Sequence, residues 1–151
     1  MTTIINGLDK LKSKVGEHLG YSDWHEVTQD QVNKFADATG DHQWIHVDVE
    51  KAKQGPFGGP IAHGYLTLSL TPTLLSQAVR VSGFKMGVYY GLNKLRFPSP
   101  VPVGSKVRAG AKMLACDDVA GGVQLTYEVT YEVEGKDKPA CVAEVLFRYY
   151  E

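Results

Sequence analysis

Residues 61–81 have the sequence IAHGYLTLSLTPTLLSQAVRV, the longest apolar stretch of helical character in the chain. Leu66, Leu70, Leu74 and Ala78 recur at spacings of four, and further leucines fill other sides of the same helix. A helix that is apolar over so much of its surface is normally buried. Pro72 lies inside the stretch and should bend or divide the helix. The stretch therefore predicts a long helix at the centre of the fold.

The second half of the chain has the composition of strands. Four runs rich in Val, Tyr, Leu and Thr predict them, at residues 86–97, 106–116, 123–133 and 141–150. Apolar and polar residues alternate along 123–133, which is typical of a strand with one buried face. Long strands after one buried helix predict an α+β fold, with an antiparallel sheet wrapped around a long central helix.

Shorter helices are expected before the central one. A first helix is predicted from the spacing of Ile4, Leu8, Leu11 and Val15. Thr28 and Gln31 have the spacing of a capping box, and Gly40 is a plausible stop for the helix that they begin. A third, short helical piece is expected at residues 48–54.

Composition limits the class of protein. The 151 residues fit one domain, 43% of them are hydrophobic and 22% charged, and the formal net charge is −1. That charge argues against a nucleic-acid partner, and no apolar run is long enough to span a membrane. Cys116 and Cys141 are too far apart for a zinc or redox pair and are expected to be small buried hydrophobes. With no apolar leader at the start, we expect a soluble, cytoplasmic protein formed by a single domain over residues 1–151.

The residues that indicate chemistry lie between the short helices. Asp41 and His46 are five residues apart on a predicted turn that enters a helix. A carboxylate and an imidazole that share one water molecule can divide the removal and return of a proton between them. Taken alone, Asp41 would more often be a turn or helix-cap residue.

A wider pattern surrounds this pair. An aromatic residue precedes a Gly-Asp pair, a histidine follows the Asp by five positions, and a small residue follows by six more: Phe35, Gly40-Asp41, His46 and Ala52. This pattern resembles the signature of the (R)-specific enoyl-CoA hydratases, the MaoC-like or hydratase-2 family. Many members have Asn-Pro where this chain has Gln43-Trp44. Residues 59–64, GPIAHG, and 90–104 also resemble family segments.

The resemblance implies a single hot-dog fold and a homodimer formed by edge-to-edge pairing of sheets. It implies reversible hydration of a trans-2-enoyl-CoA to a (3R)-hydroxyacyl-CoA, with no cofactor beyond the coenzyme A of the acyl-CoA thioester substrate. Asp41 and His46 would activate the water, with acid and base roles left open because a coupled pair titrates as a unit. The Gly64 N–H, near the start of the central helix, would stabilise the enolate.

Other site residues are weighed against structural roles. Lys94 and Arg96 are candidates for the phosphates of coenzyme A, or for a solvated strand face, and Asn93 for a polar contact in the pocket. His63 could shape the thioester pocket or cap the helix, and the cap is preferred. Since no Glu follows His42, a metal site on His42 and His46 is not expected.

Three other functions remain open. A hot-dog acyl-CoA thioesterase usually relies on a lone carboxylate and would not need the Asp41–His46 pair. A 3-hydroxyacyl-carrier-protein dehydratase subunit would use the same chemistry on another thioester. A non-catalytic acyl-thioester binding subunit is disfavoured by the presence of both residues.

Overall fold

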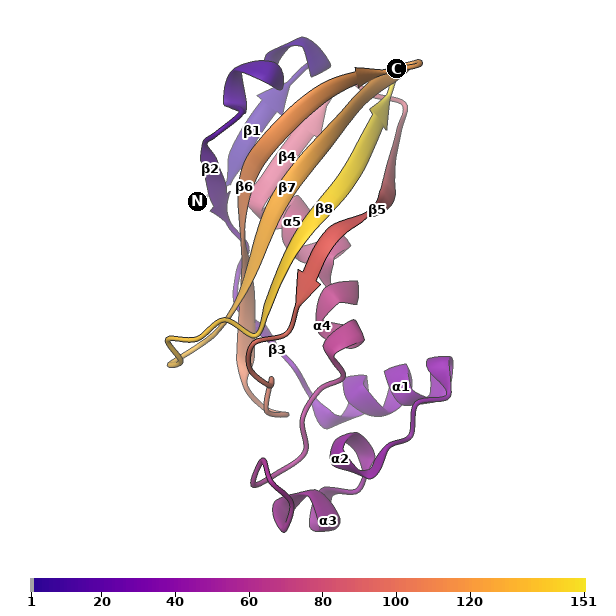
Figure 1. The fold of residues 1–151 in the computed structure, drawn as a ribbon, viewed down its shortest axis with the longest axis vertical. Coiled ribbons are helices and arrows are strands. Elements are labelled where there is room, and N and C mark those ends of the chain that lie inside the picture. Colours follow the sequence, from indigo (N-terminus) through magenta and orange to yellow (C-terminus); the bar gives the residue numbers. More distant parts are fainter. Residues whose placement is uncertain (1) are drawn as a thin grey trace.

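The computed structural model describes residues 2–151 (Figure 1). Its main sheet is antiparallel and has the strand order β2-β6-β7-β8-β5, with β3 also paired to β6. The strands span β2 His18–Tyr21, β3 His25–Glu26, β5 Met86–Arg96, β6 Lys106–Val119, β7 Gly122–Val133 and β8 Cys141–Tyr150. All four strands predicted in the second half of the chain are therefore present, and β6 is longer than expected.

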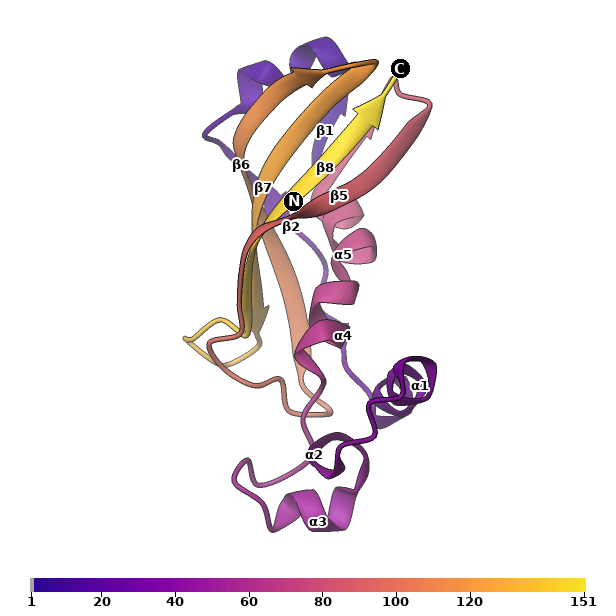
Figure 2. The same ribbon diagram turned by 45° about the vertical axis from the view of Figure 1, so that its right-hand side comes forward.

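The central helix runs along one face of the curved sheet (Figure 2). It consists of α4, Gly64–Ser69, and α5, Thr71–Ala78, which meet at Leu70. Pro72 occupies the first turn of α5, so the predicted division of the helix is confirmed. The sheet wrapped around a helix, and the α+β class, are confirmed as well.

The N-terminal segment and the end of the central helix differ from prediction. Residues 79–82 form a strand, β4 Val79–Ser82, and not the last turn of the helix. They pair in parallel with β1, Thr3–Asn6, where a helix was expected. Leu8–Lys10 and Lys12–Lys14 form only short 3₁₀ turns, η1 and η2. The predicted first helix is wrong because Gly7 has φ 99°, outside the helical region, and because β4 provides hydrogen-bonding partners for an extended segment.

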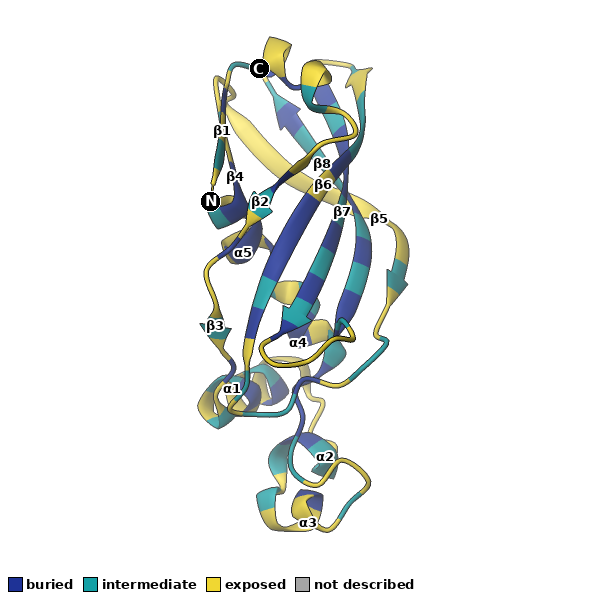
Figure 3. Ribbon diagram, turned by 90° about the vertical axis from the view of Figure 1, so that its left-hand side faces the viewer, coloured by how far each residue is buried: buried dark blue, intermediate teal, exposed yellow. Residues whose placement is uncertain are grey.

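The core lies between the central helix and the sheet (Figure 3). Along β7 the alternation predicted from the sequence is confirmed, since Tyr127, Val129 and Tyr131 are buried and their neighbours Glu128 and Thr130 are less so. From the helix, Leu74, Leu75 and Ala78 face the core. Burying a leucine side chain such as that of Leu74 contributes about 1.5–3 kcal/mol to folding. Cys116 lies in β6 and Cys141 in β8; Cys141 is fully buried as expected, whereas Cys116 is only half-buried.

Three short helices gather at one end of the sheet (Figure 1). They are α1 Gln29–Thr39, α2 Trp44–Val47 and α3 Val49–Lys53. Thr28 caps α1 by accepting from the Gln31 N–H at 3.1 Å, but the Gln31 side chain bonds His25 at 3.0 Å, so only half of the predicted capping box forms. No helix among residues 2–151 is both long and apolar enough to cross a membrane.

Candidate active site

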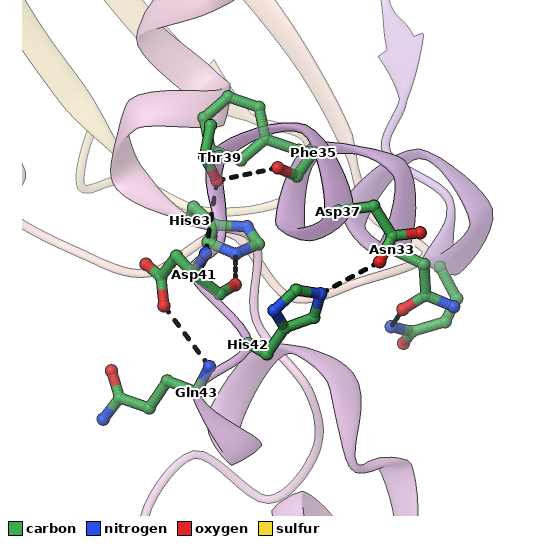
Figure 4. Close-up of polar contacts among 9 residues, drawn as sticks. Asn33, Phe35, Asp37, Thr39, Asp41, His42, Gln43 and His63 are labelled. Carbon is green, nitrogen blue, oxygen red and sulfur yellow. Dashed lines mark hydrogen bonds and ion pairs between the residues drawn. The ribbon is translucent and has the colours of Figure 1, made fainter.

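Asp41 lies at the turn that ends α1. Gly40 takes the left-handed conformation, φ 84°, which reverses the chain after the helix as predicted. The Asp41 carboxylate accepts the Gln43 N–H through Oδ1 at 3.3 Å, and the side chain is otherwise exposed (Figure 4). The turn role and the chemical role of Asp41 are thus compatible, since one oxygen orders the turn and the other remains available.

His46 lies in α2 and is only 6% exposed. Its Nδ1 donates to the carbonyl oxygen of Ile61 at 2.7 Å, while Gln29 Nε2 donates to the His46 carbonyl oxygen at 2.8 Å. A carbonyl can only accept, so Nδ1 must carry a proton in both charge states. Nε2 is therefore the atom that gains and loses a proton.

The surroundings of His46 favour its neutral form. Burial lowers the pKa of His46 below 6.5, and the neighbouring His63 lowers it further. The hydrogen bond to the Ile61 carbonyl and the nearby Asp41 carboxylate oppose this change but do not reverse it. At neutral pH the ring is thus an acceptor at Nε2, as a base for water requires.

Asp41, His46 and His63 converge. Each offers one nitrogen or carboxylate oxygen, and these atoms lie within 4.8 Å of one another. Two hydrogen bonds of about 2.8 Å that meet at the tetrahedral angle span about 4.6 Å, so one water can bridge such a pair.

A metal ion suits the same three side chains less well. The rings of His46 and His63 are stacked, with centroids 3.9 Å apart and planes 24° apart. An imidazole binds a metal in the plane of its ring at about 2.0–2.1 Å, and two stacked planes do not direct their lone pairs to one such point. The geometry therefore favours a shared water over a metal ligand set.

Gly64 and His46 line one cavity of about 380 Å³, together with Thr67, Phe57, Phe97 and Ser99. The Gly64 N–H begins α4 and has no hydrogen-bond partner among residues 2–151. A Cβ at Gly64 would lie 3.0 Å from the ring of Phe97, so any other residue would require that ring to shift by a few tenths of an ångström. Another cavity, of about 460 Å³, lies between the central helix and β5 and contains none of the predicted site residues.

The residues predicted to contact the substrate's nucleotide lie outside this cavity. Asn93, Lys94 and Arg96 are exposed on β5 and do not line the cavity of His46 and Gly64. Asn93 lies at an irregularity in the pairing of β5 with β8, so simple strand parity does not apply to it. The Lys94 ammonium is 3.6 Å from the Glu144 carboxylate, and Arg96 donates to the Leu95 carbonyl oxygen.

The expectation that the His63 side chain caps the central helix is wrong. This residue occupies the N-cap position of α4, but its side chain makes no capping bond. Its ring is buried, 3% exposed, and contacts both Asp41 and His46. Its position immediately before Gly64 was a signal, because a histidine is an unusual N-cap residue. His42, in contrast, is exposed and pairs with Asp37 at 2.9 Å.

The structure thus combines an antiparallel sheet around a buried helix with a carboxylate and an imidazole close together beside the helix start. The sequence matches the family described as MaoC like domain over residues 10–136, and the chain belongs to that family. Its fold is the hot-dog fold of these proteins, and its activity class is that of a hydro-lyase.

Individual relatives support the assignment. The chain is 57% identical over 140 residues to "3-hydroxyacyl-thioester dehydratase Z" of Mycobacterium tuberculosis strain H37Rv, covering 92% of this chain and 93% of the relative. It is 44% identical to "Nodulation protein N" of Rhizobium leguminosarum bv. viciae, covering 90% and 86%. Among solved structures, an (R)-hydratase from A. caviae involved in PHA biosynthesis matches with a TM-score of 0.68 and 27% identity, covering 87% and 95%.

Proposed function

We propose that the chain is an (R)-specific enoyl-CoA hydratase, which adds water reversibly to a trans-2-enoyl-CoA and gives a (3R)-hydroxyacyl-CoA. The observation that carries the proposal is the convergence of Asp41 and His46 within 4.8 Å, with His46 in the same cavity as Gly64. The name of the 57% identical relative, a 3-hydroxyacyl-thioester dehydratase, supports the same chemistry in the reverse direction.

The proposed reaction begins with a water molecule bound at the site. Water held between Asp41 and His46 loses one proton to the pair while its oxygen bonds to C3 of the enoyl group. The electrons of the C2–C3 double bond move toward the thioester and give an enolate, whose oxygen accepts the Gly64 N–H. A proton then reaches C2 from the same coupled pair, which is left in its original state. The reaction needs no cofactor beyond the coenzyme A of the substrate.

The test is hydration of crotonyl-CoA, followed by loss of enoyl absorbance. Asp41→Asn and His46→Gln should each lower kcat by about 10²–10⁴-fold, the usual contribution of a general acid or base. His42→Gln is the matched control, because His42 lies between Asp41 and His46 in the sequence but is exposed and pairs with Asp37. If Asp41→Asn and His46→Gln both retain wild-type rates, the proposal is wrong.

The same assay separates the alternatives. Release of free coenzyme A without hydration would indicate a thioesterase. Faster turnover of crotonyl attached to an acyl carrier protein would indicate a carrier-protein dehydratase, a choice that the word "thioester" in the relative's name leaves open. Binding of the thioester with no reaction would indicate a non-catalytic subunit.

We also propose that the protein is a homodimer formed through β5. This strand is the edge of the main sheet and is exposed along almost its whole length (Figure 3). It carries large apolar side chains that include Met86, Tyr90 and Leu92, which are 54%, 59% and 41% exposed. A long apolar edge strand normally requires a covering, and a second β5 supplies one of matching length and composition.

Asn93, Lys94 and Arg96 remain proposed contacts for the nucleotide end of the substrate. Lys94 is 75% exposed in spite of its ion pair with Glu144, so its ammonium can reach a phosphate. Removing both charges in Lys94→Ala, Arg96→Ala should raise KM for crotonyl-CoA and leave KM for crotonyl-pantetheine, which lacks the nucleotide phosphates, unchanged.

A further inference from the structure

His63 links the two proposed catalytic residues through separate contacts. Its Nε2 donates to the backbone carbonyl oxygen of Asp41 at 3.0 Å (Figure 4). Its ring stacks on that of His46, with a centroid distance of 3.9 Å. One side chain therefore fixes the backbone that carries the carboxylate and also the plane of the imidazole.

The surroundings hold His63 in turn. Its other neighbour is Phe35, whose ring centroid is 4.9 Å away at an interplanar angle of 51°. Phe35 belongs to α1, His46 to α2, and His63 directly precedes α4. The three rings thus join three elements that are separate in sequence, and burial of His63 leaves its ring little freedom to rotate.

The hydrogen bonding of His63 also fixes its tautomer. The Asp41 carbonyl can only accept, so the proton of the neutral ring is on Nε2. Nδ1 is then a lone-pair acceptor, and it is buried without a hydrogen-bond partner among residues 2–151. A buried polar atom with no partner costs free energy that an apolar ring of the same shape would not. A purely structural filler would not explain a histidine at this position.

We infer that His63 is a positioning residue of the reaction, which sets the distance and angle between the Asp41 carboxylate and His46 Nε2. The inference rests on the proposed function, because it assumes that these two groups share the reacting water. A displacement of about 1 Å in a catalytic group can cost about 100-fold in rate. Loss of either contact of His63 should therefore lower kcat and leave KM nearly unchanged, since His63 does not line the cavity of Gly64.

Three variants separate the contacts. His63→Phe keeps a ring on His46 and loses the hydrogen bond to Asp41. His63→Gln keeps an amide donor near the former Nε2 position and loses the ring. His63→Ala loses both. With crotonyl-CoA as the probe, kcat should fall about 10–100-fold in His63→Ala, less in the other two variants, and KM should stay within about twofold in all three.

A second measurement detects positioning apart from folding. The neighbouring imidazole lowers the pKa of His46, while the Asp41 carboxylate, the other titratable group that faces the ring, raises it. His63→Phe should therefore move the acid limb of kcat/KM to higher pH. Circular dichroism and thermal unfolding report whether each variant is folded.

The outcomes are distinct. Wild-type kcat and an unmoved acid limb in folded His63→Ala and His63→Phe would overturn the inference, as would failure of all three variants to fold, which would make His63 structural. If Asp41→Asn and His46→Gln keep wild-type hydration, the proposed function itself has failed. If those two lose activity while the His63 variants keep it, only the inference has failed.

Discussion

Replacement of Gly64 by alanine tests the start of the central helix. The added Cβ would lie 3.0–3.1 Å from three atoms of the Phe97 ring. That ring is 41% exposed and can shift by the few tenths of an ångström required, and alanine in place of glycine restricts the unfolded chain. The two effects are opposed, so the free energy of unfolding should change by less than about 1 kcal/mol.

The effect on catalysis should be much larger. A methyl group at Gly64 points into the contact with Phe97, on the wall of the cavity where the thioester oxygen must reach the Gly64 N–H. Alanine keeps the backbone N–H, but its methyl group would hold the thioester oxygen away from that N–H, and loss of one oxyanion hydrogen bond costs about 10²–10³-fold in kcat, or about 2.7–4 kcal/mol. We therefore expect Gly64→Ala to unfold at nearly the wild-type temperature and to hydrate crotonyl-CoA at least about 100-fold more slowly.

Gly59→Ala is the matched control. Gly59 precedes the same helix, but a Cβ there meets nothing within 4 Å. Activity should be that of the wild type. Should Gly64→Ala, with an unchanged unfolding temperature, turn over within about threefold of Gly59→Ala, the predicted close approach of the thioester oxygen to Gly64 would be wrong.

Three further predictions concern pH, core and assembly. Burial lowers the pKa of His46 below 6.5, so the acid limb of kcat/KM should lie below pH 6.5. As the pH falls from 6.5, the unfolded chain takes up a proton at His46 before the folded chain does, so the stability of the wild type relative to His46→Gln should decline until the pH passes the folded pKa. A difference in unfolding temperature that does not change with pH would contradict this. Leu74→Ala should lower the free energy of unfolding by about 2–5 kcal/mol in urea titrations, because Leu74 is 1% exposed in the core, and a loss below about 1 kcal/mol would show that the site collapses. Leu92→Lys, on exposed β5, should give a monomer by light scattering, whereas Ile4→Lys should leave a dimer, although Ile4 is apolar and even more exposed, on β1. A dimer in both would place the interface elsewhere.

Local patterns were enough to predict the four long strands of the main sheet and most of the central helix. The alternation in residues 123–133 predicts which side of β7 is buried, and Leu74 and Ala78 face the core as their spacing indicates. The segment at residues 4–15 shows where such reasoning fails. Its apolar spacing fits a helix, but the pairing of β1 with β4 depends on a strand more than 70 residues away, which no local pattern contains.

The candidate site divides in a similar way. Asp41, Gly40 and His46 are close in sequence, so their spacing and turn chemistry predict a shared site, and the structure brings Asp41 and His46 together. His63 is 22 residues from Asp41, and its contact arises only when the start of α4 folds against α1 and α2. The tautomer of His46 likewise depends on Ile61, which was outside the predicted motif.

The segment 61–64 is where the fold and the proposed chemistry meet. Ile61 bridges to Pro102 beside the sheet, and its carbonyl orients His46. The Ala62 N–H donates to the Val101 carbonyl oxygen at 2.8 Å, which joins the segment to a second residue of the cavity lining. His63 then holds Asp41, and Gly64 opens the central helix with its free N–H. Four consecutive residues thus connect the His46 imidazole, the cavity wall, the Asp41 backbone and the proposed oxyanion donor to one short piece of backbone. Because that backbone continues into the buried helix, the packing of the leucines in residues 61–81 determines the position of the chemistry as well as the fold.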